Sequence, residues 1–394
     1  MKKDTKVIRA GHSKKRNAGI VNTPVYHAST VVFDSIAQLK DVQPRALKGE
    51  KALYYGRLGT PTHWTLEEAI TELAGGADTI LTPSGVAACA LAILGCVKAG
   101  DHILVSDSAY EPTRKLSDGL LKEFGVVTTY YDPCIGSGIE ALMRDNTRLI
   151  FCESPGSHTF EVQDIPAIAK VAHARKAKVA VDNTWASLVL CRPLDLGADI
   201  TIEAGTKYLC GHSDAVIGAV TATADALPGL RRALLALGYA VGPDDVYLTT
   251  RGLRTLAVRL ARHQQNGLMV ARWLQGRPEV KRVLYPALPE DPGHALWKRD
   301  FQGASGLMGV LLHRTSPAAV AAMVDNMEIF SLGYSWGGFE SLIAPSAPKT
   351  IRTAVPWTEA EPGLRLHIGL EDPADLIDDL AKGFARLTAA LPHQ

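Results

Sequence analysis

The sequence predicts an α/β fold in which helices flank a mostly parallel sheet, followed by a smaller C-terminal α+β domain. Three observations support this prediction. Apolar strand-like runs alternate with helix-like segments from about residue 60 to about residue 225. These runs are apolar almost without interruption, which is typical of parallel strands buried on both faces. The composition then changes at about residue 226, where a long helical region begins.

The composition indicates a soluble globular protein. Hydrophobic residues make up 46% of the 394 residues and charged residues 21%, which are ordinary values for a globular chain. The 42 basic and 41 acidic residues give a formal net charge of +1. Because proteins that bind nucleic acid usually carry a basic surplus, we expect no nucleic-acid partner.

The chain carries no expected targeting signal, membrane span or metal site. Its basic start, MKKDTKVIRAGHSKKRN, lacks the apolar region of a secretory signal. No stretch approaches the roughly 18–20 apolar residues of a membrane span. The six cysteines form no CxxC pair, as expected for buried thiols in a reducing compartment. No histidines show HExxH-type spacing, so we expect no metal site. Without a signal or a membrane span, we expect a cytoplasmic protein.

Residues 1–58 are expected to form an arm. Pro24, Pro44 and Gly49 interrupt its short apolar pieces, and an arm with little core of its own usually packs on a second subunit. The arm ends in YYGRLGTPTH, residues 54–63. The guanidinium and phenol groups there suit a phosphate dianion, but an aromatic loop packed on a surface explains them equally well.

The α/β region begins with a helix expected at 62–76, with a capping threonine, an acidic first turn and two glycines at its end. Further helices are expected at 86–100, 112–125 and 165–177. Strands are expected at 79–83, 101–110, 126–132, 148–155, 178–185 and 198–208.

A long, partly broken helical region is expected to connect this sheet to the C-terminal domain. That domain contains strand-like VKRVLYP and LMGVLLHR, helix-like SPAAVAAMVDNM and a closing helix, PADLIDDLAKGFARLTAAL. We therefore expect three parts: the arm at 1–58, a ligand-binding α/β domain at 59–254 and a C-terminal α+β domain at 255–394.

Four expected strand ends carry polar residues, and parallel sheets bind ligands at the carboxyl ends of their strands. Residues 84–86 (Ser-Gly-Val) join a strand to a helix, so their backbone N–H groups can bind an anion, although simple chain geometry also explains such a turn. Tyr110 can stack on a planar ligand or pack as an ordinary tyrosine. Asp182 and Lys207 occupy the other two ends.

Asp182 and Lys207 carry the most specific chemistry. A buried carboxylate at the end of an apolar strand costs several kcal/mol unless it is paired, although Asp182 is alternatively a structural cap for the turn after it. Lys207 follows three small residues that leave its amine unshielded. An Asp for a pyridinium nitrogen and a Lys for a Schiff base are what pyridoxal phosphate requires. The pair therefore predicts pyridoxal 5′-phosphate as the cofactor of this sheet.

Six segments, in the expected order, resemble the Cys/Met-metabolism (trans-sulfuration) family of fold-type-I pyridoxal-phosphate enzymes. They are YGRLGTPT, TPSGVAA, VDNTW, GTKYLCGHSD, TTRGLRTLAVR and LRLHIGLED. The resemblance covers nearly the whole chain and implies a transferase-like, mostly parallel sheet. FSLGYSWGGFESL, residues 330–342, is most similar to the bacterial cystathionine β-lyases, because γ-specific relatives typically have glutamate in place of Tyr334 and no aromatic residue in place of Trp336.

The resemblance implies how the cofactor is held. Lys207 would bind it covalently and then shuttle a proton, and Asp182 would pair with the ring nitrogen. Further contacts would come from the ring of Tyr110, the backbone of Gly85 and Val86, the hydroxyl of Thr206, and Tyr55 and Arg57 of a neighbouring subunit. A dimer is then the smallest active unit, and tetramers are common in the family.

The resemblance also implies a substrate site. Arg365 would clamp the α-carboxylate with a bidentate fork, helped by Ser335, and Tyr334 with Trp336 would shape the pocket. The candidate catalytic residues are Lys207, Tyr110 and Tyr55.

Two positions depart from the family pattern. Ala204 stands where many relatives have a serine that touches the phosphate, so one phosphate hydrogen bond is absent. Ser157, in ESPGSH, stands where many relatives have an asparagine near the cofactor's ring hydroxyl, so the resemblance assigns no role to Ser157.

The implied reaction is β-elimination from L-cystathionine to homocysteine, pyruvate and ammonia, a step of methionine biosynthesis. Side activity on cystine or other cysteine thioethers is expected, because the chemistry is the same. One alternative is the γ-elimination or γ-replacement of other family members. A second is a non-catalytic regulatory protein on the same scaffold, which the absence of a basic surplus disfavours.

Overall fold

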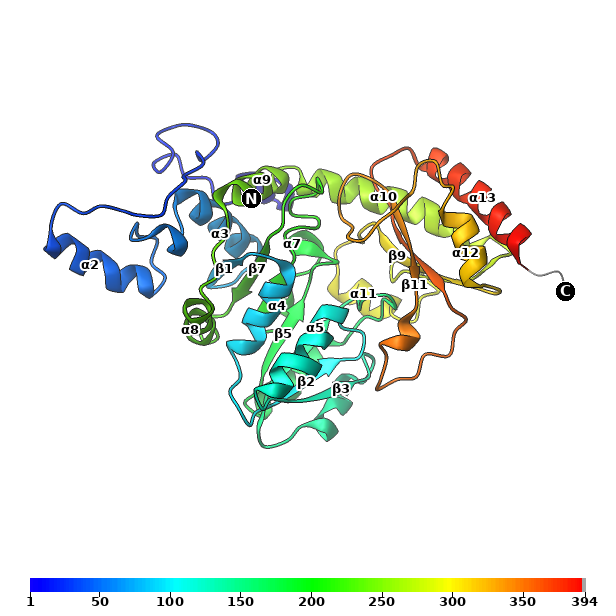
Figure 1. The fold of residues 1–394 in the computed structure, drawn as a ribbon, viewed down its shortest axis with the longest axis horizontal. Coiled ribbons are helices and arrows are strands. Elements are labelled where there is room, and N and C mark those ends of the chain that lie inside the picture. The colour runs from blue at the N-terminus through cyan, green and yellow to red at the C-terminus, as the bar shows by residue number, and fades with distance from the viewer. Residues whose placement is uncertain (392–394) are drawn as a thin grey trace.

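Two sheets organise the molecule in a computed structural model that describes residues 1–391 (Figure 1). A seven-stranded sheet occupies the middle of the molecule. A five-stranded sheet lies at one end with the closing helix, and the N-terminal arm projects from the opposite end. The molecule is therefore elongated, with the larger sheet between two smaller parts.

The seven-stranded sheet has the order β1-β7-β6-β5-β4-β2-β3. Its strands are β1 (Asp78–Thr82), β2 (His102–Ser106), β3 (Val127–Tyr131), β4 (Thr147–Glu153), β5 (Lys178–Asp182), β6 (Ile200–Glu203) and β7 (Gly218–Ala222). β7 runs antiparallel to its neighbours β1 and β6, and the other neighbouring pairs are parallel. The expected mostly parallel sheet is confirmed, and the carboxyl ends of β4, β5 and β6 lie at one edge.

Both faces of the central strands are buried, which explains their nearly unbroken apolar sequences. In β4, Leu149 and Phe151 join one hydrophobic cluster, whereas Ile150 and Cys152 join another, because the side chains of a strand alternate between faces. Helix α4 (Gly85–Leu94) contributes to the first cluster and α6 (Ile165–Ala174) to the second. The sheet is therefore covered by helices on both sides.

Two expected helices differ from the structure. Helix α3 (Pro61–Ala74) is capped by Thr60 and has no acidic residue in its first turn. The expected acidic first turn is wrong because the helix starts at Pro61, which moves its glutamates beyond that turn. The expected helix at 112–125 is divided into α5 (Glu111–Leu116) and a π-helical turn, η2 (Ser117–Leu121).

The second sheet has the order β10-β11-β12-β9-β8. Its strands are β8 (Val280–Leu284), β9 (Leu307–Leu312), β10 (Ser331–Leu332), β11 (Leu342–Ser346) and β12 (Gly363–His367). The helices that follow β7 in the chain are α8 (Leu227–Leu237), α9 (Pro243–Leu253), α10 (Leu256–Gln275), α11 (His294–Asp300), α12 (Pro317–Val324) and α13 (Pro373–Ala390). The remaining short helices are α7 (Ser187–Leu190), η3 (Gly136–Leu142), η4 (Pro193–Leu196) and η5 (Pro348–Thr350).

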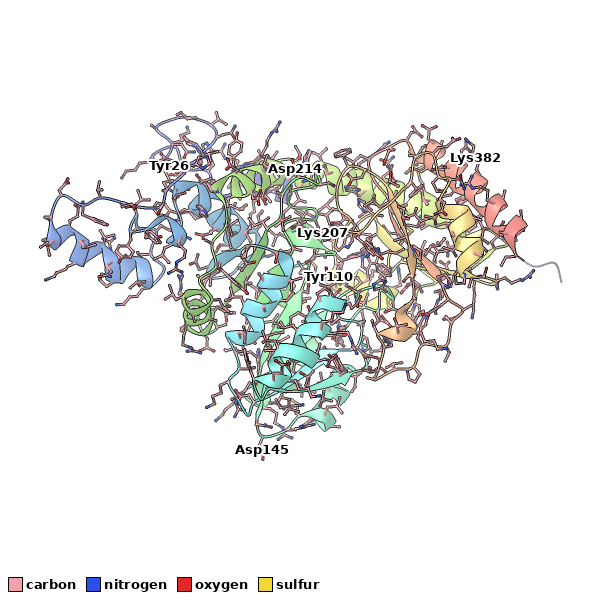
Figure 2. All side chains as sticks on the ribbon, viewed as in Figure 1. Tyr26, Tyr110, Asp145, Lys207, Asp214 and Lys382 are labelled. Carbon is pink, nitrogen blue, oxygen red and sulfur yellow. The ribbon has the colours of Figure 1, made fainter. Side chains whose placement is uncertain are left out.

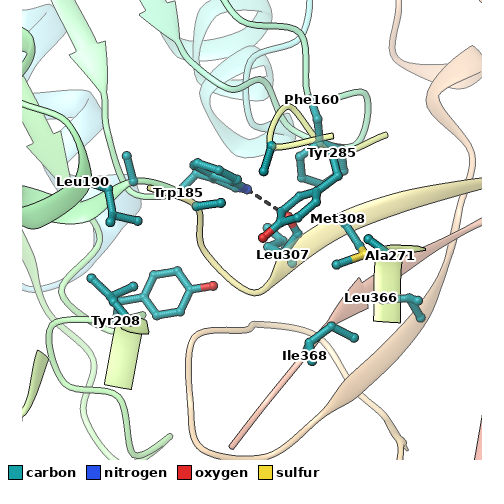
Figure 3. Close-up of a cluster of buried hydrophobic side chains, with 14 of the residues drawn as sticks. Phe160, Trp185, Leu190, Tyr208, Ala271, Tyr285, Leu307, Met308, Leu366 and Ile368 are labelled. Atoms are coloured by element: carbon teal, nitrogen blue, oxygen red, sulfur yellow. Dashed lines mark hydrogen bonds between the residues drawn. The ribbon is translucent and has the colours of Figure 1, made fainter. Parts of the chain in front are cut away.

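One hydrophobic cluster joins the two sheets (Figure 3). Trp185, which follows β5, donates its indole N–H to the carbonyl oxygen of Leu307 on β9 at 2.9 Å. Tyr208, next to the candidate lysine, accepts a hydrogen bond from the backbone N–H of Gly306 at 3.0 Å. These contacts fix the edge of the larger sheet against the start of β9.

A buried carboxylate makes a second junction. Asp107, which has no exposed surface, accepts hydrogen bonds from the backbone N–H groups of residues 353–355. Arg114 and Arg352 also pair with it, at 2.9 and 3.1 Å. The loop between β11 and β12 is thereby anchored to the segment that precedes Tyr110.

The arm contains α1 (Lys3–Arg9), α2 (Ile36–Leu47) and η1 (Gly56–Leu58). Several of its apolar side chains face solvent in the single chain, including Val32 and Ile36, which are 88% and 72% exposed. Across residues 1–391, none of the helices combines the length and the apolar character that crossing a membrane requires.

Candidate active site

Three carboxyl-terminal strand ends form the floor of the site. Glu153 at the end of β4 pairs in register with Asp182 at the end of β5, and Lys207 follows β6 in a tight turn. Figure 2 labels Lys207 and Tyr110 in the centre of the molecule, where the two sheets meet. This is the edge at which parallel sheets bind ligands.

The side chain of Lys207 is partly buried between the two sheets. Its Nζ donates a hydrogen bond to Ser335 Oγ at 2.7 Å and lies 5.1 Å from the centre of the Trp336 ring. Burial and the nearby Arg365 guanidinium lower the pKa of Lys207 to about 8, and Asp182 opposes this shift. A substantial fraction of the amine is therefore neutral near physiological pH, as a nucleophile or base requires.

Asp182 is buried and bonded on one side. Its Oδ1 accepts the Thr184 backbone N–H at 3.0 Å and the Thr184 hydroxyl at 2.5 Å. Its Oδ2 has the Cys89 thiol at 3.7 Å. Burial raises the pKa of Asp182, while the bonds from Thr184 and Cys89 and the charge of Lys207 lower it in part. A cation placed beside Oδ2 would favour the ionised carboxylate further.

Glu153 is a partly buried carboxylate that the sequence alone did not assign to the site. Its Oε2 accepts the backbone N–H of Tyr110 at 2.6 Å, and its Oε1 accepts the Ser157 hydroxyl at 2.5 Å. Burial, followed by the charge of Asp182, raises the pKa of Glu153 well above its usual value. The signal that could have found it is the one used for Asp182, an acid at the end of an apolar strand.

Tyr110 begins helix α5, and its side chain remains 42% exposed. Burial, followed by Cys89, Glu153 and Asp182, raises the pKa of its phenol, whereas Arg365 lowers it. The phenol therefore keeps its proton at neutral pH and lies within electrostatic reach of both Asp182 and Arg365.

The start of α4 forms a candidate anion site. Ser84 caps the helix by accepting the Ala87 N–H at 3.1 Å. Gly85 and Val86 occupy the first turn, whose N–H groups have no helical partner. A Cβ on Gly85 would lie 2.7 Å from the Ala204 Cβ. The close approach of α4 to the Lys207 turn therefore depends on small residues at both positions.

Thr206 is also at this turn, but its hydroxyl is engaged. It donates to the Ile217 carbonyl oxygen at 3.2 Å and accepts the Ile217 N–H at 3.0 Å. Donation to a phosphate would have to replace the bond to the Ile217 carbonyl.

Arg365 lies in the middle of β12, opposite Ala344 and Gly309. Burial lowers its pKa, and nearby Tyr110 and Tyr334 raise it. No acidic partner pairs with its guanidinium within residues 1–391. A partly buried guanidinium with no carboxylate partner among the described residues suits a carboxylate ligand.

Residues 333–340 form a loop that covers Lys207. Ser335 and Gly337 have positive φ angles of 81° and 89°, and a Cβ on Gly337 would lie 2.9 Å from the Lys207 carbonyl carbon. Tyr334 is 91% exposed. The loop thus directs Ser335 and Trp336 to the amine, while Tyr334 faces solvent in the single chain.

Tyr55 and Arg57 are on the arm, at the start of the short helix η1 and within it. Tyr55 pairs with Thr30 through an isolated β-bridge and is 43% exposed. Within one chain, the structure does not bring either residue to Lys207, so their expected role in a neighbouring subunit stays a prediction.

The residues of this edge fit pyridoxal phosphate. An amine with a lowered pKa, a buried carboxylate with one oxygen weakly bonded, and a helix start with glycine at its closest approach to the lysine turn lie at one edge of the larger sheet. These groups match the aldehyde, ring nitrogen and phosphate of that cofactor.

The chain matches the model of the family described as "Cys/Met metabolism PLP-dependent enzyme" over residues 4–385. It is 46% identical to the cystathionine β-lyase of Salmonella typhimurium, over 98% of each chain. It is also 46% identical to the cystathionine β-lyase MetC of Escherichia coli, over 98% of this chain and 99% of that one.

The structure is similar to a crystal structure of cystathionine γ-synthase from Xanthomonas oryzae in complex with cystathionine. The TM-score is 0.90 at 33% identity, and the match covers 99% of this chain and 100% of that one. The fold is therefore common to β- and γ-acting enzymes, while the sequence is more similar to the β-lyases.

Proposed function

This chain belongs to the Cys/Met-metabolism family of pyridoxal-phosphate-dependent enzymes, and from that premise we propose that it is a carbon–sulfur lyase acting on L-cystathionine. The products are homocysteine, pyruvate and ammonia, as in methionine biosynthesis. The observation that carries the proposal is the partly buried Lys207 amine, with a pKa lowered to about 8, which donates to Ser335 and lies near Arg365, a guanidinium without an acidic partner in residues 1–391.

The cofactor site uses the residues at the sheet edge. When bound, pyridoxal phosphate supplies an electron sink for negative charge at the substrate Cα. Lys207 would hold the cofactor covalently, Asp182 would keep its ring nitrogen protonated, and Tyr110 would stack on the ring. The phosphate is held by the N–H groups of Gly85 and Val86 and the hydroxyl of Thr206, with Tyr55 and Arg57 of a neighbouring subunit.

The substrate is oriented by Arg365, which receives the α-carboxylate in a bidentate pair, with Ser335 beside it. Neutral Lys207 Nζ would then remove the Cα proton of the oriented substrate. The Cβ–S bond then breaks, and Nζ returns its proton to the departing homocysteine thiolate. The remaining three-carbon fragment takes up water and yields pyruvate and ammonia. Proton transfer by a positioned amine is typically worth about 10²–10⁴-fold.

The γ-reactions of the same family are the second candidate, favoured by the close structural match to a γ-synthase. Their products differ, since γ-elimination of cystathionine gives cysteine and 2-oxobutyrate. Trp336, against the lysine amine, and Tyr334 at the pocket rim are proposed to direct the elimination to Cβ. Cystine and other cysteine thioethers are proposed as slower substrates.

The assembly is proposed to be a homotetramer in which two subunits share each active site. The exposed apolar side chains of the arm support a contact with a second copy. We keep the division into an arm (1–58), a cofactor-binding domain (59–254) and a C-terminal domain (255–394) as a proposal. A cytoplasmic location is also proposed, supported by six free cysteines.

The test is to identify the keto acid and the thiol formed from L-cystathionine. Pyruvate with homocysteine supports β-elimination, whereas 2-oxobutyrate with cysteine overturns it. Lys207→Ala should lose nearly all pyruvate production, with Lys170→Ala, an exposed lysine, as the matched control. Pyruvate production by Lys207→Ala at the wild-type rate would exclude the role proposed for the lysine.

A further inference from the structure

Thr184 lies where the pairing of β5 with β6 ends. The two strands are paired in parallel as far as Asp182 and Ile202, and the Asn183 N–H continues the pattern by donating to the Ile202 carbonyl oxygen at 2.9 Å. The next N–H of the second strand belongs to Ala204. It donates to the Thr184 hydroxyl at 2.9 Å, so a side chain replaces a backbone acceptor at this point.

The orientation of the Thr184 hydroxyl is fixed by its partners. Its oxygen accepts the Ala204 N–H, and therefore its single proton is free to go to Asp182 Oδ1, 2.5 Å away. The side chain is only 7% exposed, so water competes little for either bond.

The two oxygens of the Asp182 carboxylate are consequently unequal. Oδ1 accepts both the hydroxyl and the backbone N–H of Thr184. Oδ2 has only the thiol of Cys89, at 3.7 Å, and a thiol is a weak donor. Oδ2 is therefore the oxygen that remains available to a cationic ring nitrogen.

The same hydroxyl reaches the lysine turn. The Ala204 carbonyl oxygen accepts the backbone N–H of Lys207 at 3.0 Å, and this bond begins the turn that carries the amine. One hydroxyl thus connects the carboxylate at the end of β5 to the peptide that starts the Lys207 turn.

We propose that Thr184 is a positioning residue that turns Asp182 Oδ2 toward the ring nitrogen of the cofactor and fixes that carboxylate relative to Lys207. This inference rests on the proposed function for the identity of the cofactor. It goes further by explaining how Asp182 and Lys207, the two residues proposed to hold that cofactor, are fixed relative to each other. Thr184 itself touches neither cofactor nor substrate in this assignment.

Electrostatics support the geometry. Asp182 is buried beside Glu153, and burial raises its pKa; the two bonds from Thr184 are the largest opposing influences. Loss of the hydroxyl would leave the Ala204 N–H buried without an acceptor and would let the carboxylate take up a proton at higher pH.

The experiment measures cofactor binding directly. The full chain, stripped of cofactor, is titrated with pyridoxal 5′-phosphate and followed by absorbance and tryptophan fluorescence. Thr184→Val, which keeps the shape but loses the hydroxyl, should weaken binding at least tenfold at pH 7. Thr184→Ser should remain within about threefold of the wild type. Thr201→Val is the matched control, because that buried hydroxyl on β6 has no partner within residues 1–391.

The pH dependence separates positioning from general damage. If Thr184→Val has a higher Asp182 pKa, its loss of cofactor affinity relative to the wild type should grow as the pH falls from 8 to 6 and shrink as the pH rises. A constant deficit across this range would overturn the proposal, as would wild-type binding by Thr184→Val.

A double-mutant cycle keeps the test decisive if Thr184→Val is unstable. In the Asp182→Asn background, Thr184→Val should have little further effect on cofactor binding, because the two residues act as one unit. Additive losses would overturn the proposal. The readout does not involve cystathionine, so a chain that binds cofactor as described but forms no pyruvate would refute the proposed function and leave this inference standing.

Discussion

Lys207 Nζ donates to Ser335 Oγ at 2.7 Å across 128 residues of sequence. The bond spans the two sheets, since the lysine follows β6 of the larger sheet and the serine lies between β10 and β11 of the smaller one. The smaller sheet therefore contributes directly to the position of the amine.

Replacing Ser335 should slow proton transfer without unfolding the chain. A hydrogen bond to a charged group is worth about 1.5–3 kcal/mol, so we expect Ser335→Ala to lower kcat on L-cystathionine roughly 10–100-fold. Ser335→Gly relieves the cost of the positive φ angle but also removes the hydroxyl. Equal losses in both variants would assign the effect to the hydroxyl; full activity in Ser335→Gly would assign it to the backbone.

The rate should follow the state of the lysine amine. With a pKa lowered to about 8, the protonated form predominates below that value, and only the neutral form removes a proton. We expect kcat to rise with pH up to about 8 and to level above it. The measurement is kcat for pyruvate release between pH 6 and 10, and a profile that falls over this range would contradict the assignment.

Gly337 should not tolerate a side chain. Its φ of 89° is unfavourable for alanine, and the added Cβ would lie 2.9 Å from both the Lys207 carbonyl carbon and the Tyr208 nitrogen. We expect Gly337→Ala to displace the loop over the amine and lower kcat at least tenfold, with a loss of about 1–3 kcal/mol in the free energy of unfolding. Gly333→Ala, whose nearest contact would be 3.6 Å, is the control.

Asp107→Asn should lower the free energy of unfolding by about 3–5 kcal/mol at pH 7, because it breaks a buried ion pair. Burial alone would raise the pKa of Asp107, but the backbone donors at 353–355 and Arg352 lower it below 3.8. Its stabilisation is therefore present above about pH 4 and lost as pH falls through the lower folded value. Urea unfolding measures this effect: the difference in unfolding free energy between the variant and the wild type should be smaller at pH 3 than at pH 7.

Asp145→Asn provides the control for that comparison, because this carboxylate is exposed at the edge of the larger sheet (Figure 2). We expect a change in unfolding free energy of less than about 0.5 kcal/mol. If Asp145→Asn lost as much unfolding free energy as Asp107→Asn, the effect would come from the change in net charge and not from the contacts of Asp107.

The parallel sheet and its functional edge could be predicted because they depend on local patterns. Unbroken apolar runs reveal strands buried on both faces, and acids or lysines directly after them reveal the ligand edge. Asp182 and Lys207 were found in this way. Glu153 gives the same signal but was not assigned, because a strand-end acid has no visible role until Tyr110 is seen to donate to it.

Other features depend on distant contacts and gave no local signal. Thr184 matters through its contact with the Ala204 N–H, which lies twenty residues further along the chain, after α7, η4 and β6. β11 contains Pro345, so the sequence of this segment does not predict a strand. Its pairing with β12 defines it as one. The positive φ of Ser335 likewise could not be predicted, because serine has no preference for that conformation.

The antiparallel course of β7 has a mechanical consequence. The chain leaves β6, passes through Lys207 and returns beside β6 as β7, and the two bonds between Thr206 and Ile217 clamp the loop at its base. The main chain around Lys207 is therefore fixed on both sides, by strand β6 before it and by the bonds to Ile217 after it. The side chain of Lys207 is therefore the part of this segment that is left free to move. In the roles proposed for it, the lysine would hold the cofactor and then transfer a proton by rotating its side chain, while its main chain stays in place.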